Sequence, residues 1–99
     1  MAQNNKLVYE VSVDYDTTIN GDKLHAHNTI GIYEDVDDAV EAAMINSDDD
    51  LTAEDAKRSI DLEGYVGICG HPMMIGGVYA KHVVATVTEH ALITSTKEP

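Results

Sequence analysis

The chain has 99 residues, of which eighteen are acidic and six are basic, and its formal charge is −12 at pH 7. This charge disfavours direct binding to DNA, RNA or anionic lipid, because such binding depends on Lys and Arg side chains that neutralise phosphates. There is no Phe or Trp, a single Cys, and no apolar run near the roughly 20 residues of a membrane helix. We expect one domain over residues 1–99, with frayed tails at 1–5 and 95–99, in a reducing, cytoplasmic compartment.

From Leu7 to Ile19, apolar side chains alternate with acidic and hydroxyl side chains, which predicts a long strand with one wet face. Asn20-Gly21 then predicts a two-residue hairpin turn, because both turn positions need a positive φ. In the strand that follows, the even positions carry the apolar side chains Leu24, Ala26, Ile30 and Ile32.

Such a turn pairs residues whose numbers sum to 41. On the core face, this register predicts the pairs Tyr15–Ala26, Val11–Ile30 and Tyr9–Ile32. On the outer face, it predicts Ser12–Thr29, Asp14–His27 and Asp16–His25. A slip of one residue would place apolar side chains opposite polar ones throughout, so the pattern favours this register.

The segment Thr29–Ile45 changes from strand periodicity to helix periodicity at Glu34-Asp35. Asp35 is suited to cap the helix, because its side chain can accept hydrogen bonds from the free amides of the first turn. One helical face carries only apolar residues: Val36, Ala39, Val40, Ala43 and Met44.

A second short helix is expected from its N-cap, Thr52, to a stop at Gly64, with Ala53, Ala56 and Ile60 on its inner face. Beyond it, Tyr65–Cys69 is typical of a short strand, and 78–94 of a last strand with apolar side chains at odd positions from Tyr79 to Ile93. A strand this long requires a bend or bulge, or offers an exposed pairing edge.

The predicted fold is therefore α+β. A long β-hairpin and the C-terminal strand or strands form an antiparallel sheet with two helices on one face, in the order β-β-α-α-(β)-β. The long edge of the last strand makes a homodimer through that strand an expectation.

The outer sheet face gathers His25, His27, His82 and His90 beside Asp14 and Asp16. Two imidazoles that point the same way from one strand can ligate a divalent metal together with an aspartate. Cross-strand Asp–His pairing satisfies the same side chains without a metal, and we expect no cofactor. The glycine-rich segment 64–77 is a second candidate site, since glycines beside Met73 and Met74 allow a ligand to approach closely.

No nucleophile and base can be paired from the sequence, so we expect no enzyme. Cys69, among Val and Ile residues, is expected in the core. The acidic side chains of the two helices and of the segment between them are the candidate partner-binding residues: Glu34, Asp37, Asp38, Glu41, Asp48, Asp49, Asp50, Glu54 and Asp55.

Helices whose exposed faces carry several carboxylates, as these residues would, can imitate the phosphate rows of DNA. In size, charge and lack of a catalytic motif, the chain resembles small acidic inhibitors of nucleic-acid enzymes: phage-encoded DNA mimics, anti-restriction and anti-CRISPR proteins, and nuclease immunity proteins. The resemblance implies an inhibitor of a basic, nucleic-acid-binding protein. The alternative is a small-molecule- or metal-binding homodimer that uses the histidine-bearing face or the glycine-rich segment.

Overall fold

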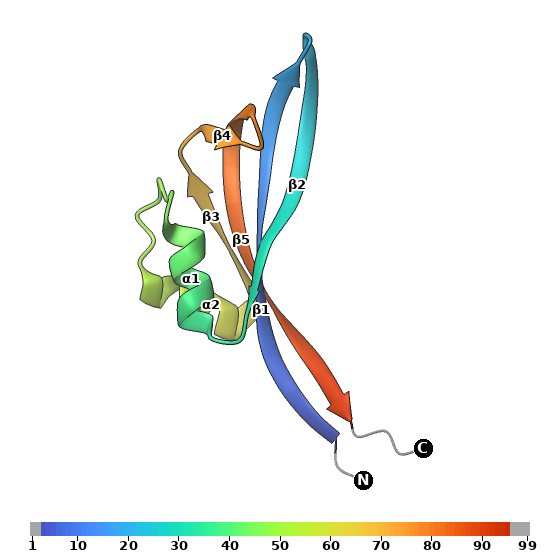
Figure 1. Cartoon of the computed structure of the whole chain (residues 1–99). Coiled ribbons are helices and arrows are strands. Elements are labelled where there is room, and N and C mark those ends of the chain that lie inside the picture. Colours follow the sequence, from blue (N-terminus) through green and yellow to red (C-terminus); the bar gives the residue numbers. More distant parts are fainter. Residues whose placement is uncertain (1–2, 96–99) are drawn as a thin grey trace.

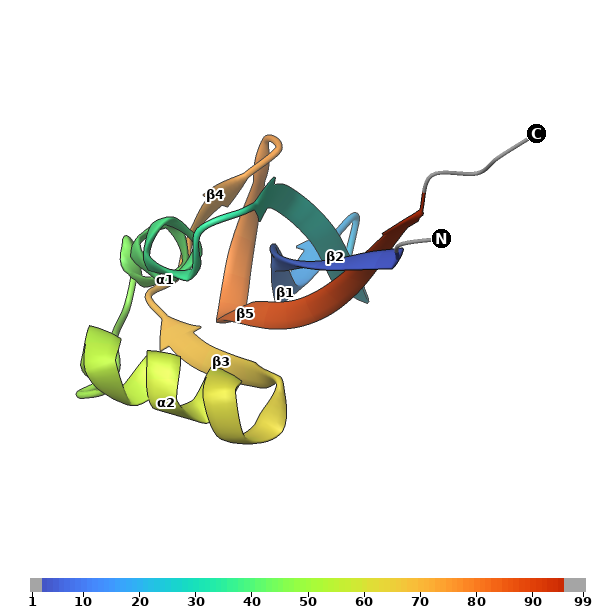
Figure 2. The same ribbon diagram turned by 90° about the horizontal axis from the view of Figure 1, so that it is seen from below.

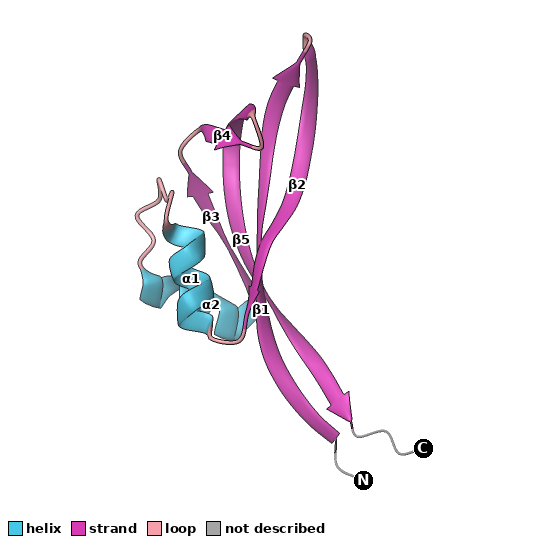
Figure 3. Cartoon of the chain, in the orientation of Figure 1, coloured by secondary structure: helices cyan, strands magenta, loops and turns pink. Residues whose placement is uncertain are grey.

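A computed structural model describes residues 3–95, and the side chains of residues 6–91 within them. Its five strands form one antiparallel sheet, in which β2-β1-β5-β3 are neighbours in that order and β4 pairs with β5 (Figure 1). The elements are β1 (Gln3–Ile19), β2 (Asp22–Tyr33), α1 (Val36–Met44), α2 (Ala53–Glu63), β3 (Tyr65–Gly70), β4 (Met73–Ile75) and β5 (Val78–Ser95). The predicted α+β fold is confirmed (Figure 3).

The hairpin turn has the predicted geometry, since Asn20 and Gly21 have φ values of 54° and 85°. From Ile19 back to Ser12, β1 pairs with β2 in the predicted register. The outer-face pairs Asp14–His27 and Asp16–His25 are therefore confirmed, as is Tyr15–Ala26 on the core face.

Beyond Ser12 the predicted register is wrong, because β2 carries a bulge there and Val11 lies opposite Gly31. Tyr9 consequently pairs with Tyr33. Ile30 is the extra residue, and Ile32 moves to the outer face, so both are exposed. The alternation of β2 contains no sign of this extra residue.

A second irregularity occurs in β5, where the pairing with β1 shifts between Asp14 and Asp16. His82 lies there in the left-handed region, with a φ of 54°. In the part of β5 that precedes the inserted residue, even-numbered instead of odd-numbered side chains face the core. Ala80 is therefore buried and Tyr79 is exposed, contrary to the prediction. Of the alternatives stated for this long strand, a bend, a bulge or an exposed pairing edge, the structure has the bulge.

The expectation of a long exposed edge on the last strand is wrong. β5 lies in the interior of the sheet, with β1 on one side and β3 on the other along 83–88. Only its C-terminal part, beyond the end of β3, has a free side. The backbone of 3–5 pairs with that of 93–95, so β1 and β5 continue into segments predicted as tails. Residues 1–2 and 96–99 lie outside the described part.

Both helices pack on the same face of the sheet (Figure 2). The core between the helices and the sheet is aliphatic, and its largest fully buried side chains are Ile68, Val11, Val40 and Val87. The predicted inner face of α1 is confirmed, with Ala39, Val40 and Ala43 buried and Val36 and Met44 packed against the cluster.

Two further predicted core positions, one on α2 and one on β3, are exposed instead. On α2, Ala56 and Ile60 are buried but Ala53 is exposed, because the first turn of the short helix reaches past the sheet. On β3, Val66 and Ile68 point inward, so the alternation places Cys69 on the opposite face, where it is exposed.

The molecule is elongated, with a radius of gyration of 16.1 Å and extents of 56 × 34 × 18 Å. A compact domain of this length has a radius of gyration of about 13 Å. The difference arises from two ribbons that project from the sheet (Figure 1). One is the tip of the β1–β2 hairpin, and the other is formed by the N-terminal part of β1 and the C-terminal part of β5.

The C-terminus of α2 provides a test of the capping assignment. Gly64 has a φ of 85° and donates its N–H to the carbonyl oxygen of Ile60 at 2.8 Å. We expect Gly64→Ala to lower the free energy of unfolding by about 1 kcal/mol, because L-residues are strained in the left-handed region. Gly67→Ala is the matched control, since its Cβ would meet only Val84 Cγ1, at 3.6 Å. Equal urea midpoints for the two variants would contradict the assignment.

Candidate functional surfaces

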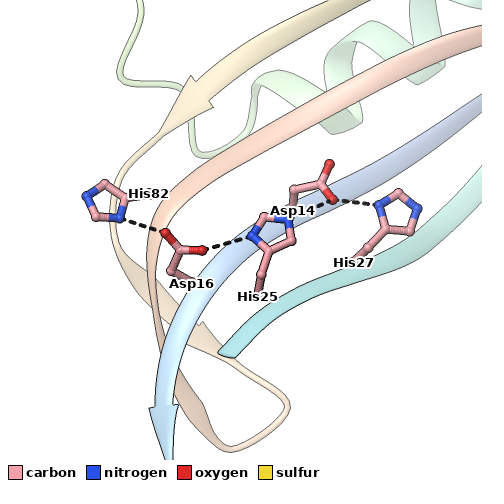
Figure 4. Close-up of polar contacts among 5 residues, drawn as sticks. All are labelled: Asp14, Asp16, His25, His27 and His82. Atoms are coloured by element: carbon pink, nitrogen blue, oxygen red, sulfur yellow. Dashed lines mark hydrogen bonds and ion pairs between the residues drawn. The ribbon is translucent and has the colours of Figure 1, made fainter. Parts of the chain in front are cut away.

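The outer face of the sheet carries a row of alternating histidine and aspartate side chains from three strands (Figure 4). Asp16 contacts His82 Nδ1 through Oδ2 at 3.1 Å and His25 Nδ1 through Oδ1 at 2.8 Å. Asp14 Oδ1 lies 2.7 Å from His27 Nδ1 and 3.7 Å from His25 Nε2. The row therefore links β5, β1 and β2 side by side.

Local sequence explains each position in this row. Asp14 and Asp16 share the wet face of β1, and the hairpin register places His27 and His25 directly opposite them. His82 reaches Asp16 from β5 at the bulge where its own backbone is left-handed. Sequence analysis found the first four residues and the cross-strand pairing. It also placed His82 on this face, but it did not predict the bulge at which the backbone of His82 is left-handed.

Hydrogen bonding between Asp16 and His25 shifts the pKa of both groups. The hydrogen bond with His25 is the main cause that lowers the pKa of the Asp16 carboxyl. The same bond is the main cause that raises the pKa of His25, and the charges of Asp16 and Asp14 add to it. Each group thus favours the charged form of the other.

Farther along the same face, Glu10 forms a second cross-strand group. Its Oε2 accepts a hydrogen bond from the Thr29 hydroxyl at 2.6 Å, and its Oε1 lies 2.9 Å from His90 Nε2. The bond from Thr29 is the largest cause that lowers the pKa of Glu10, followed by that from His90. Like the Asp16 row, this group joins β1 to both of its neighbours.

The predicted metal site is not assembled. Among the residues that the structure describes, no three His, Cys, Asp or Glu side chains are placed to hold a metal ion. His25 and His27 do point the same way from β2, but the Nδ1 atom of each faces a carboxylate oxygen. The alternative stated from sequence, cross-strand Asp–His pairing, describes the observed contacts.

The glycine-rich segment lies against the connection between the helices. His71 N donates to the carbonyl oxygen of Asn46 at 3.1 Å, and Asn46 Nδ2 donates to the carbonyl oxygen of His71 at 2.7 Å. A Cβ at Gly70 would approach Asn46 O to 3.0 Å, so this glycine permits the close packing. The segment also forms β4, which sequence analysis missed because three residues show no periodicity.

An apolar groove of about 190 Å³ opens beside this segment. It lies between the end of α1, the edge strand β2 and the start of β4, with Ile45, Ile30 and Met73 among its lining residues. Sequence analysis did not find this groove, because the bulge that leaves Ile30 exposed could not be read from the alternation.

The acidic residues predicted to bind a partner lie in three places on the helical layer. Asp37, Asp38 and Glu41 are exposed on α1, with Glu34 just before it. Glu54 and Asp55 occupy the first turn of α2, and Asp48–Asp50 lie between the helices. All of these side chains are exposed except Asp55, which is half-buried.

Few cations neutralise this layer. Lys57 Nζ lies 2.7 Å from Asp37 Oδ1 and joins α2 to α1, and the resulting hydrogen bond is the main cause that raises the pKa of Lys57. Arg58 contacts Asp55 at 3.3 Å, and Lys6 from β1 contacts Glu34 at 2.9 Å. The other predicted carboxylates form no ion pair with Lys or Arg within the described side chains.

The Asp16–His25 pair makes stability depend on pH. The raised pKa of His25 contributes stability below its ordinary value of 6.5, which is lost as the pH rises through the raised value. The lowered pKa of Asp16 contributes stability at pH values above its ordinary pKa of 3.8, and this stability is lost as the pH falls through the lowered pKa.

We expect Asp16→Asn to be most destabilising between about pH 4 and 6.5, and to lower the NMR-titrated pKa of His25. Asp22→Asn, the control, should leave that pKa unchanged, and an unshifted His25 in Asp16→Asn would refute the pairing.

No family model, no curated protein and no solved structure matches this chain. Within residues 3–95, neither helix has the length and hydropathy needed to cross a membrane. The surfaces described above are therefore the observations from which function is argued.

Proposed function

We propose that this chain is a non-enzymatic binding module that antagonises a basic, nucleic-acid-binding protein through its acidic helical surface. The observation that carries the proposal is the charge of the segment Glu34–Glu63. It contains twelve of the eighteen acidic residues of the chain and only two of the six basic ones.

The fold directs this charge to one side of the molecule. The apolar faces of α1 and α2 are buried against the sheet, so their polar faces are turned to solvent. A dense negative surface raises the association rate with a positively charged partner by electrostatic steering. The same charge disfavours nucleic acid itself as the ligand.

Apolar side chains within the acidic layer could provide affinity once the partner has arrived. Leu62 is exposed on α2 between Asp61 and Glu63, and Ile45 is exposed at the end of α1. Steering by charge and retention by a few desolvated apolar anchors is a common division of roles at interfaces. This combination supports an inhibitor of the DNA-mimic, anti-restriction, anti-CRISPR or nuclease-immunity type.

The test begins with affinity capture from the native host and identification of the bound protein by mass spectrometry. With that protein purified, the association rate is measured at low and high salt. We expect it to fall at least about tenfold between about 50 and 500 mM salt, because salt screens electrostatic steering. A rate that does not respond to salt would refute the proposal.

Neutralised variants locate the surface. Asp38→Asn/Glu41→Gln removes two unpaired carboxylates from α1, and we expect it to slow association about threefold or more. Asp14→Asn/Asp22→Asn removes the same charge from the β1–β2 hairpin, away from the helices, and serves as the matched control. Equal effects of the two variants would contradict a helical docking surface.

Competition between the chain and duplex DNA for the purified partner then separates a DNA mimic from an inhibitor that binds elsewhere.

A further inference from the structure

The free edge of β2 is the longest unpaired backbone edge among the described residues. β2 pairs with β1 on one side only, so its opposite edge is open along Asp22–Tyr33. The other outer strand, β3, is partly covered, because Asp48 N donates to the carbonyl oxygen of Cys69 at 2.8 Å and Ser47 bridges to Gly70. An open strand edge is a template for pairing with another strand.

The hairpin determines which backbone groups face this edge. In a two-residue turn, the residues that flank it, Ile19 and Asp22, exchange hydrogen bonds with each other, and bonded and non-bonded pairs then alternate along the ladder. The N–H and C=O groups of β2 that turn away from β1 are therefore those of Lys23, His25, His27 and Thr29. They form a regular row that ends at the bulge.

Apolar side chains lie beside this row. Leu24 is 47% exposed, Ile30 is 54% exposed and Ile32 is 68% exposed. Leu24 and Ile30 are on the helix-bearing side of the strand, and Ile30 also lines the apolar groove. Aliphatic side chains this exposed on an unguarded edge favour association.

The charge and the sequence of this edge both favour a second copy as the occupant. The whole chain carries −12, but Asp22–Tyr33 contains one Asp and one Lys, so its formal charge is zero. Two copies that meet through β2 avoid placing their acidic helical surfaces against each other. The strand is also complementary to itself: with His27 opposite His27, Leu24 lies opposite Ile30, and every outward-facing backbone group from His25 to Thr29 finds its counterpart.

We propose that two copies of the chain pair through β2 in an antiparallel, two-fold symmetric arrangement with His27 on the axis, which joins their sheets into one. Leu24 of one protomer then packs beside Ile30 of its partner on both sides of the axis. This pairing also supports the β1–β2 ribbon, since a lone two-stranded ribbon is only marginally stable in water. It places both acidic helical layers on the same face of the joined sheet and does not depend on the proposed function.

Light scattering coupled to size exclusion tests the pairing in the full chain, from about 1 to 200 µM. We expect a dimer that Ile30→Lys converts to a monomer, because a charge would replace the apolar contact with Leu24 of the partner on both sides of the axis. Leu7→Lys is the matched control, since Leu7 is also an exposed strand residue, at 45%, but lies on the other ribbon. Circular dichroism and thermal unfolding verify that both variants fold.

A monomer at the highest concentration would overturn the proposal and leave the edge to a strand of another protein. A dimer that survives in Ile30→Lys would overturn it as well.

Disulfide trapping tests the register. In a Cys69→Ser background, we expect Leu24→Cys/Ile30→Cys to form a covalent dimer on mild oxidation, because positions 24 and 30 would face each other across the interface at a non-hydrogen-bonded pair. Leu24→Cys alone should remain uncrosslinked, since position 24 does not face itself. Absence of the bridge in the double variant, or efficient bridging in the single one, would overturn the arrangement.

Discussion

The structure depends on β1, whose side chains alternate between the helix-bearing face and the outer face of the sheet. β1 pairs with β2 on one side and with β5 on the other, so its side chains lie at the centre of both faces of the sheet. Val11 and Tyr15 anchor the core. On the outside, Glu10 and Asp16 bind side chains of both neighbouring strands, and Asp14 binds those of β2. One strand therefore organises the apolar core and the polar network together, and exchanging its faces would destroy both.

Two bulges change what this alternation would otherwise produce. The bulge in β2 leaves Ile30 exposed and carries Ile32 to the outer face, and that in β5 places His82 against Asp16 while it turns Tyr79 outward. Each inserted residue redirects the side chains on one side of it to the opposite face of the sheet. The exposed aliphatic edge of β2 and the complete His–Asp row are consequences of these two insertions.

The distribution of charge separates the two faces of the molecule. On the outer sheet face, most carboxylates are paired with imidazoles of neighbouring strands. On the helical layer, carboxylates greatly outnumber cations and remain exposed. The first arrangement joins strands, and the second is suited to attract a positively charged surface. This contrast is the reason for proposing a basic partner at the helices and a second copy at the neutral edge of the sheet.

The sequence by itself determined the features that depend on local periodicity and turn chemistry. These are the hairpin at Asn20-Gly21, the caps at Asp35 and Thr52, the apolar face of α1, and the pairing of Asp14 and Asp16 with histidines. Tertiary structure alone decided the bulges, the interior position of β5, the exposure of Cys69 and Ala53, and the apolar groove. The physical reason is that an inserted residue or a strand order is selected by how distant segments pack, and such packing leaves no periodic trace in either segment.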